Sequence, residues 1–145
     1  MKLAAIVCAL CAALVGGAAS ASAPPSGSVQ GRVLVNPLVV TLAVPTGAVK
    51  AGQSFRIQAL VANIGRTTLQ NVAVTLVVPQ PLVLRDKATQ AFSSLGPAQV
   101  RAVAWSACTT TPGGYIVMAR ATAGPFTSES TGQLVQIAPA NRPRC

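Results

Sequence analysis

The chain contains no histidine and only two acidic residues, Asp86 and Glu129. Histidine is the usual general base near neutral pH and the commonest metal ligand, so its absence excludes the Ser-His and Cys-His pairs that activate a nucleophile. The two carboxylates stand on separate segments, whereas a glycosidase needs a close pair and a calcium site needs several clustered acids. No glycine-rich phosphate loop ending in Lys-Ser or Lys-Thr is present. We therefore expect no enzyme activity, no catalytic residue, no metal ligand and no cofactor.

Aromatic residues are also scarce, at 3% of the chain. Proteins that bind single-stranded nucleic acid combine a basic groove with exposed aromatic rings on which the bases stack. Phe55 and Trp105 stand at core-like strand positions. Tyr115 is also better placed to fill the core than to stack on a base or on the sugar ring of a carbohydrate ligand. The sequence therefore argues against nucleic acid as a partner.

The N-terminal segment has the layout of a secretory signal peptide. Lys2 precedes an apolar run over residues 3–15, and the small-residue pattern of residues 20–23 is followed by Pro24 and Pro25. The run is shorter than the roughly 20 residues that a membrane span requires. We predict cleavage after Ala23 rather than retention as an anchor, and hence an exported protein, periplasmic or extracellular, with no transmembrane segment after cleavage.

Four cysteines are present, and Cys8 and Cys11 fall within the predicted signal peptide. Neither follows a small residue, so we do not expect lipidation. Cys108 and Cys145 would remain after export, and an oxidising compartment favours a disulfide between them. An intramolecular bridge would pin the tail, with a chain-entropy contribution of about 4 kcal/mol, whereas Cys145 could instead bond a second chain.

Beyond the leader, the chain consists of short apolar or alternating runs separated by turn residues, with no helical period. Residues 53–62 alternate most clearly, and Pro79 and Pro81 end the run over 71–78. The predicted strands span residues 28–35, 39–44, 53–62, 71–78, 88–93, 100–107, 115–122 and 131–138. Seven or eight strands with frequent turns predict an all-β antiparallel sandwich in which Trp105 is the buried anchor.

The break after the third predicted strand contains Asn63 and Gly65. Both residue types tolerate left-handed backbone angles, and an asparagine side chain can bond the backbone of its own turn. We therefore predict that these two residues form a structural corner rather than a ligand site.

The segment over residues 36–138 resembles the bacterial immunoglobulin-like modules grouped as CARDB, NEW3 and related repeat domains. The similarity rests on the opening strand 37–41, the Val-Lys-Ala-Gly-Gln-Ser turn at 49–54, the Val-Ala-Asn-Ile-Gly corner at 61–65, the strand 71–79 ending in Val-Pro, Leu-Gly-Pro-Ala at 95–98 and Gly-Tyr-Ile-Val at 114–117. Ala98 departs from the glycine that these modules usually carry. The resemblance implies an immunoglobulin-like sandwich over residues 36–138. From composition and pattern, a leader with a candidate first strand over 24–35 precedes it, and a basic tail over 139–145 follows.

Two functions of different classes fit these features. Valines on both faces of residues 71–78, and Leu60 on the polar face of its strand, favour a secreted non-catalytic module that binds a protein partner or assembles with itself through sheet edges or apolar faces. The formal net charge of +9, or about +8 without Lys2, favours instead an adhesion module for an anionic glycan or lipid surface. Scattered basic residues could equally serve solubility. The candidate anion contacts are Arg56, Arg101 and Arg120.

Overall fold

The computed structural model describes residues 35–145, so most of the predicted leader and first strand lies outside the described residues. The described residues form ten strands: β1 (Leu38–Ala43), β2 (Val49–Lys50), β3 (Phe55–Asn63), β4 (Leu69–Val77), β5 (Val83–Leu84), β6 (Thr89–Leu95), β7 (Val100–Cys108), β8 (Gly113–Ala123), β9 (Phe126–Glu129) and β10 (Gln133–Ala138). Within residues 35–145 no helix has the length and apolar character needed to span a membrane.

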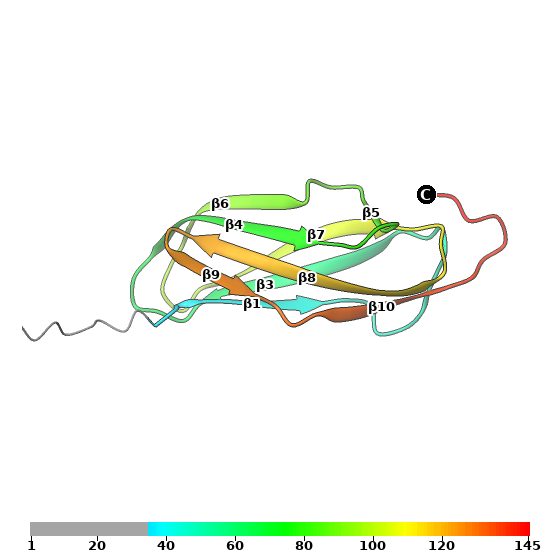
Figure 1. Ribbon diagram of the computed structural model, residues 1–145. Coiled ribbons are helices and arrows are strands. Elements are labelled where there is room, and N and C mark those ends of the chain that lie inside the picture. Colours follow the sequence, from blue (N-terminus) through cyan, green and yellow to red (C-terminus); the bar gives the residue numbers. More distant parts are fainter. Residues whose placement is uncertain (1–34) are drawn as a thin grey trace, which may run out of the picture. The chain divides into compact units, whose positions relative to one another are not determined.

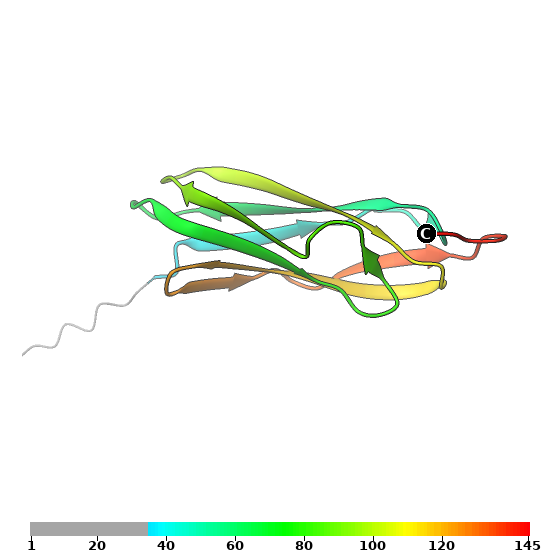
Figure 2. The same ribbon diagram turned by 90° about the horizontal axis from the view of Figure 1, so that it is seen from above.

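The strands form two sheets that pack face to face (Figures 1 and 2). The first sheet has the order β1-β3-β7-β5, and the second has the order β2-β10-β8-β4-β6, with β9 also paired to β8. Every pair is antiparallel except the short β2–β10 pair. This arrangement confirms the predicted all-β sandwich.

The core lies between the two sheets and follows from the period of two in each strand. In β3, Phe55, Ile57, Ala59 and Val61 point inward and are buried, while the residues between them are exposed or half-buried. Trp105 is the largest fully buried side chain, only 1% exposed, and its indole N–H donates to the Lys87 carbonyl over 3.0 Å. The predicted anchor is therefore buried with its polar atom satisfied, as a buried tryptophan requires.

Asn63 and Gly65 form the predicted corner, and of the two reasons expected, the side-chain hydrogen bonding of Asn63 is present while the left-handed backbone angles are not. Neither residue has a positive φ. The Asn63 side chain is buried, donates to the carbonyls of Thr67 and Leu95 over 2.8 and 2.9 Å, and accepts the Gly65 N–H over 2.9 Å. A Cβ on Gly65 would lie 2.6 Å from Cβ of Pro37, so glycine is required here by close packing.

Three short strands, β2, β5 and β9, were not expected from the sequence. The first two have only two residues each, which is too short for any period to be read. Strand β9 folds back on β8 through a tight turn in which Gly124 has a φ of 55°. Strand β8 itself ends at Ala123, one residue beyond the predicted end at residue 122.

The tail after β10 is fixed to the sandwich by a disulfide between Cys108 and Cys145, whose Cα atoms are 5.9 Å apart. The structure therefore has the intramolecular pairing. Gly52, with a φ of 83°, allows the tail to pass closely, since a Cβ there would lie 2.5 Å from the Arg144 amide nitrogen. The Arg85 guanidinium also donates to the Cys145 carbonyl over 2.8 Å.

Candidate interaction surface

A row of large apolar side chains crosses the outward face of the second sheet. Leu134 of β10 lies directly opposite Ile116 of β8, and Met118 of β8 lies directly opposite Val77 of β4. These four side chains are 52%, 62%, 36% and 54% exposed, respectively. Because Ile116 and Met118 are two residues apart on one strand, the four form a continuous row, which we call the apolar row.

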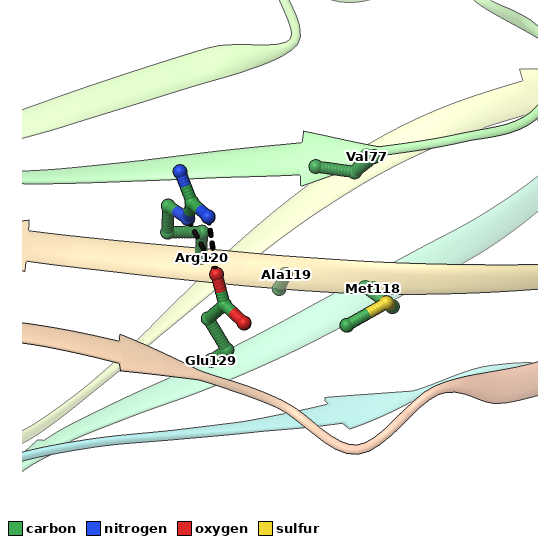
Figure 3. Close-up of a pocket in the computed structure, with 5 residues that line it drawn as sticks. All are labelled: Val77, Met118, Ala119, Arg120 and Glu129. Carbon is green, nitrogen blue, oxygen red and sulfur yellow. Dashed lines mark hydrogen bonds and ion pairs between the residues drawn. The ribbon is translucent and has the colours of Figure 1, made fainter.

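The apolar row borders an ion pair on the same face. The Arg120 side chain donates to Glu129 Oε1 over 2.7 Å, joining β8 to β9. The paired side chains and part of the row line a shallow recess of about 230 Å³, formed by Val77, Met118, Ala119, Arg120 and Glu129 (Figure 3). The recess is large enough for one side chain of a partner, with an apolar wall and a charged wall.

The connection between β9 and β10 is hydrogen-bonded to β8 next to the apolar row. Between β9 and β10 the chain leaves the edge of β8, and Ser130 bridges the gap: its N–H donates to the Ala119 carbonyl over 2.8 Å, and its hydroxyl accepts the Ala119 N–H over 2.9 Å. A Cβ on Gly132 would lie 2.8 Å from Cγ2 of Ile116. The connection therefore packs against the row and holds its side chains in place.

The edge of β7 that faces away from β3 is covered over residues 104–108, where β5 pairs with it at its end. The Ser106 N–H donates to the Asp86 carboxylate over 2.7 Å, and the Ser106 carbonyl accepts the Arg85 N–H over 2.9 Å. Further along, the Ala104 carbonyl accepts a bond from the Gln90 side chain over 2.7 Å. Such coverage blocks strand addition over this half of β7, so it favours a sheet face over this stretch as a binding surface.

The three candidate anion contacts do not share a face. Arg56 is exposed on the outward face of the first sheet, and Arg120 lies on the outward face of the second. Arg101 pairs in register with buried Val61, and its guanidinium carbon lies 5.0 Å from the ring centre of Phe92 on the other sheet. The structure therefore brings none of the three together.

The alternation of residues 115–122 indicates that Ile116 and Met118 point away from the buried face of their strand. The sequence alone did not predict that Leu134 and Val77 lie beside them. The available signal was the presence of large apolar residues on the face that also carries Arg120. Leu60, predicted on the polar face of β3, is 42% exposed on the first sheet.

Comparison with solved structures places the fold. A CARDB domain from Pyrococcus furiosus superposes with a TM-score of 0.55 and 16% identity, covering 70% of this chain and 87% of that one. The chain has the fold of a CARDB domain. This CARDB-like module is also similar to part of the Escherichia coli alpha-2-macroglobulin structure (TM-score 0.60, 17% identity, 72% and 17% of the two chains) and to a FixG-related protein from Vibrio parahaemolyticus (TM-score 0.53, 12% identity, 71% and 98%). No protein-family model and no curated protein sequence matches it.

The Pyrococcus domain is described as a complex with di-metal ions. The donor set of the CARDB-like module does not fit such a centre. Its two carboxylates are engaged separately, Asp86 with the Ser106 N–H and Glu129 with Arg120. The sequence has no histidine, and residues 35–145 contain no group of three metal-ligating side chains.

Proposed function

We propose that this chain is an exported, non-catalytic immunoglobulin-like module that binds a protein partner, or a second copy of itself, through the outward face of its second sheet. The observation that carries the proposal is the apolar row. Contiguous exposed apolar side chains on a soluble domain are typical of interaction sites. On this face the flanking charges, Arg120 and Glu129, already neutralise each other, so a partner can cover them without leaving either one unpaired.

The energetics favour this face. Covering the rest of a half-exposed leucine, isoleucine, valine or methionine contributes on the order of 1 kcal/mol. Four adjacent side chains therefore supply about 4 kcal/mol, enough for the centre of an interface that polar contacts at its rim would complete. The recess beside Met118 provides a place for one anchoring side chain of the partner.

Export is supported by the signal-like layout of residues 1–23 and by the Cys108–Cys145 bridge, since stable disulfides belong to oxidising compartments. Intact mass of the protein recovered from outside the cytoplasm tests this part. We expect a chain that begins at Pro24 and gains the mass of two hydrogen atoms on reduction. A mass that includes residues 1–23 would contradict cleavage.

The binding face is tested by placing a photo-crosslinking amino acid at position 116 in the producing cells. We expect adducts from this position with one defined protein, either a second copy or another exported chain. The matched control is position 60, which is exposed on the opposite sheet. Equal yields from the two positions, or adducts from neither, would refute the proposal. The substitution Ile116→Glu should reduce formation of the same complex at least tenfold, while Leu60→Glu should not.

A second candidate, binding of an anionic glycan or surface, is supported by a different observation. Basic side chains from several segments lie at the end of the sandwich where β3 begins, β7 finishes and β10 leads into the tail.

A further inference from the structure

One end of the sandwich gathers basic side chains that are far apart in the sequence. At this end β3 begins, β7 finishes and the C-terminal tail folds back (Figure 1). Arg56 of β3 lies opposite Ser106 of β7, and the Ser106 carbonyl accepts the Arg85 N–H over 2.9 Å. Arg56 and Arg85 therefore flank one residue, on either side of β7.

The tail adds further cations to the same place. The Arg85 guanidinium donates to the carbonyl of Cys145, which directly follows Arg144. On the other side of the end, Lys50 pairs in register with Ala138, where the tail begins, and Arg142 is exposed within the tail. We call Lys50, Arg56, Arg85, Arg142 and Arg144 the basic end.

A polar recess of about 540 Å³ opens beside these residues. It is lined by Lys50, Pro139, Ala140 and Asn141. An ammonium group and a carboxamide are therefore available to an oxygen-rich ligand within the recess. The nearby carboxylate, Asp86, already accepts the Ser106 N–H, so it is partly engaged within the protein.

We propose that the basic end binds an acidic polysaccharide, with the arginines contacting its carboxylate, sulfate or phosphate groups and the recess receiving a sugar ring. This inference rests on the second candidate function and is independent of the apolar row. Of the five side chains that would make it, only Arg56 is among the three candidate anion contacts expected from the sequence, and the other four are new. Guanidinium groups form paired hydrogen bonds with such oxyanions, and a row of them suits a polymer with repeating charges.

Other polyanions fit less well. Single-stranded nucleic acid needs exposed aromatic rings, but Trp105 and Tyr115 are buried and Phe92 lies against Arg101. A bilayer favours a flat surface with several apolar side chains to insert. The basic end has a recess instead, and a single exposed valine, Val83, next to its disulfide offers little apolar surface for insertion.

The disulfide assembles this site. Arg142 and Arg144 belong to the tail, which is held by the Cys108–Cys145 bond and passes over Gly52. Reduction releases the tail and removes two of the five cations from their fixed positions. Binding of the polysaccharide should therefore be stronger in the oxidised protein than in the reduced one.

The test measures how tightly the oxidised protein over residues 24–145 binds heparin across a range of salt concentrations. Heparin serves as the probe because it is a sulfated and carboxylated polymer. We compare the triple variant Arg56→Gln, Arg142→Gln, Arg144→Gln with a matched triple variant, Arg66→Gln, Arg101→Gln, Arg120→Gln. Both lose the same net charge. At about 1 kcal/mol, or fivefold, per contacting cation, we expect the first to lose on the order of 100-fold in affinity and the second less than fivefold.

Equal losses in the two triple variants would overturn the proposal, because net charge alone would then explain binding. Tighter binding to anionic vesicles or to single-stranded DNA than to heparin, compared at equal salt, would also overturn it. Reduction of the wild type should weaken heparin binding at least fivefold, and unchanged binding would contradict the role of the tail. Ile116→Glu should leave heparin binding unchanged, so failure of the apolar row and failure of the basic end can be told apart.

Discussion

Replacing Asn63 by alanine should lower the free energy of unfolding by about 3 kcal/mol. The side chain is 1% exposed and makes three hydrogen bonds, two as donor to the carbonyls of Thr67 and Leu95 and one as acceptor from the Gly65 N–H. Each contributes about 1 kcal/mol, and the Leu95 carbonyl is left buried without its partner. For a small domain this is a large fraction of the total stability of about 5–15 kcal/mol.

The substitution Asn63→Asp separates hydrogen bonding from packing. The new carboxylate could still accept the Gly65 N–H, but it would face two carbonyl oxygens in a buried site. Burial and these oxygens would raise its pKa above the ordinary value of about 3.9. Because the pKa would be higher in the folded state, the loss of stability should be smallest below pH 3.9 and should grow as the pH rises through the folded-state pKa.

Guanidinium unfolding followed by fluorescence of Trp105, which is the single tryptophan and is buried, measures both effects. With a slope of about 3 kcal/mol per molar, the midpoint for Asn63→Ala should fall by roughly 1 M. Gln70→Ala, at an exposed position of β4, is the control and should change stability by less than about 0.5 kcal/mol. A loss below about 1 kcal/mol for Asn63→Ala, or a loss for Asn63→Asp that does not shrink in acid, would refute the assignment of these hydrogen bonds.

The remaining predictions concern backbone positions and the tail. Ala98 has a φ of 54° in the turn closed by the Gln99 N–H and the Gly96 carbonyl, so Ala98→Gly should raise the unfolding free energy by about 1 kcal/mol, and a lower melting temperature would contradict this. Cys145→Ser should cost up to about 4 kcal/mol, since the bridge spans a separation of 37 residues, and an unchanged denaturant midpoint would refute that role. Gly52→Ala should displace the tail, because its Cβ would lie 2.5 Å from a backbone atom. We expect a lower melting temperature and weaker heparin binding, whereas wild-type values for both would show that the tail does not pass there.

The sequence was enough to predict the elements that depend on local pattern. Alternation over residues 53–62 predicted β3 within two residues at either end, and the β-branched run at 71–78 predicted β4 equally well. Trp105 could be assigned to the core because it is the single tryptophan and stands at a core-like position of a predicted strand. The absence of histidine and the scarcity of acids restricted the chemistry before any fold was known. These features follow from residue type and a period of two, both of which are local.

Only the tertiary structure decided which residues meet. The period of β8 separates Ile116 and Met118 from its buried face, but pairing with β10 and β4 places Leu134 and Val77 beside them. In the same way, Arg56, Arg85 and Arg144 converge because register, a backbone hydrogen bond and a disulfide join three distant segments. Strand register and sheet stacking are set by contacts between residues far apart in the chain, so a pattern read along the sequence can assign a side chain to a face but not to its neighbours.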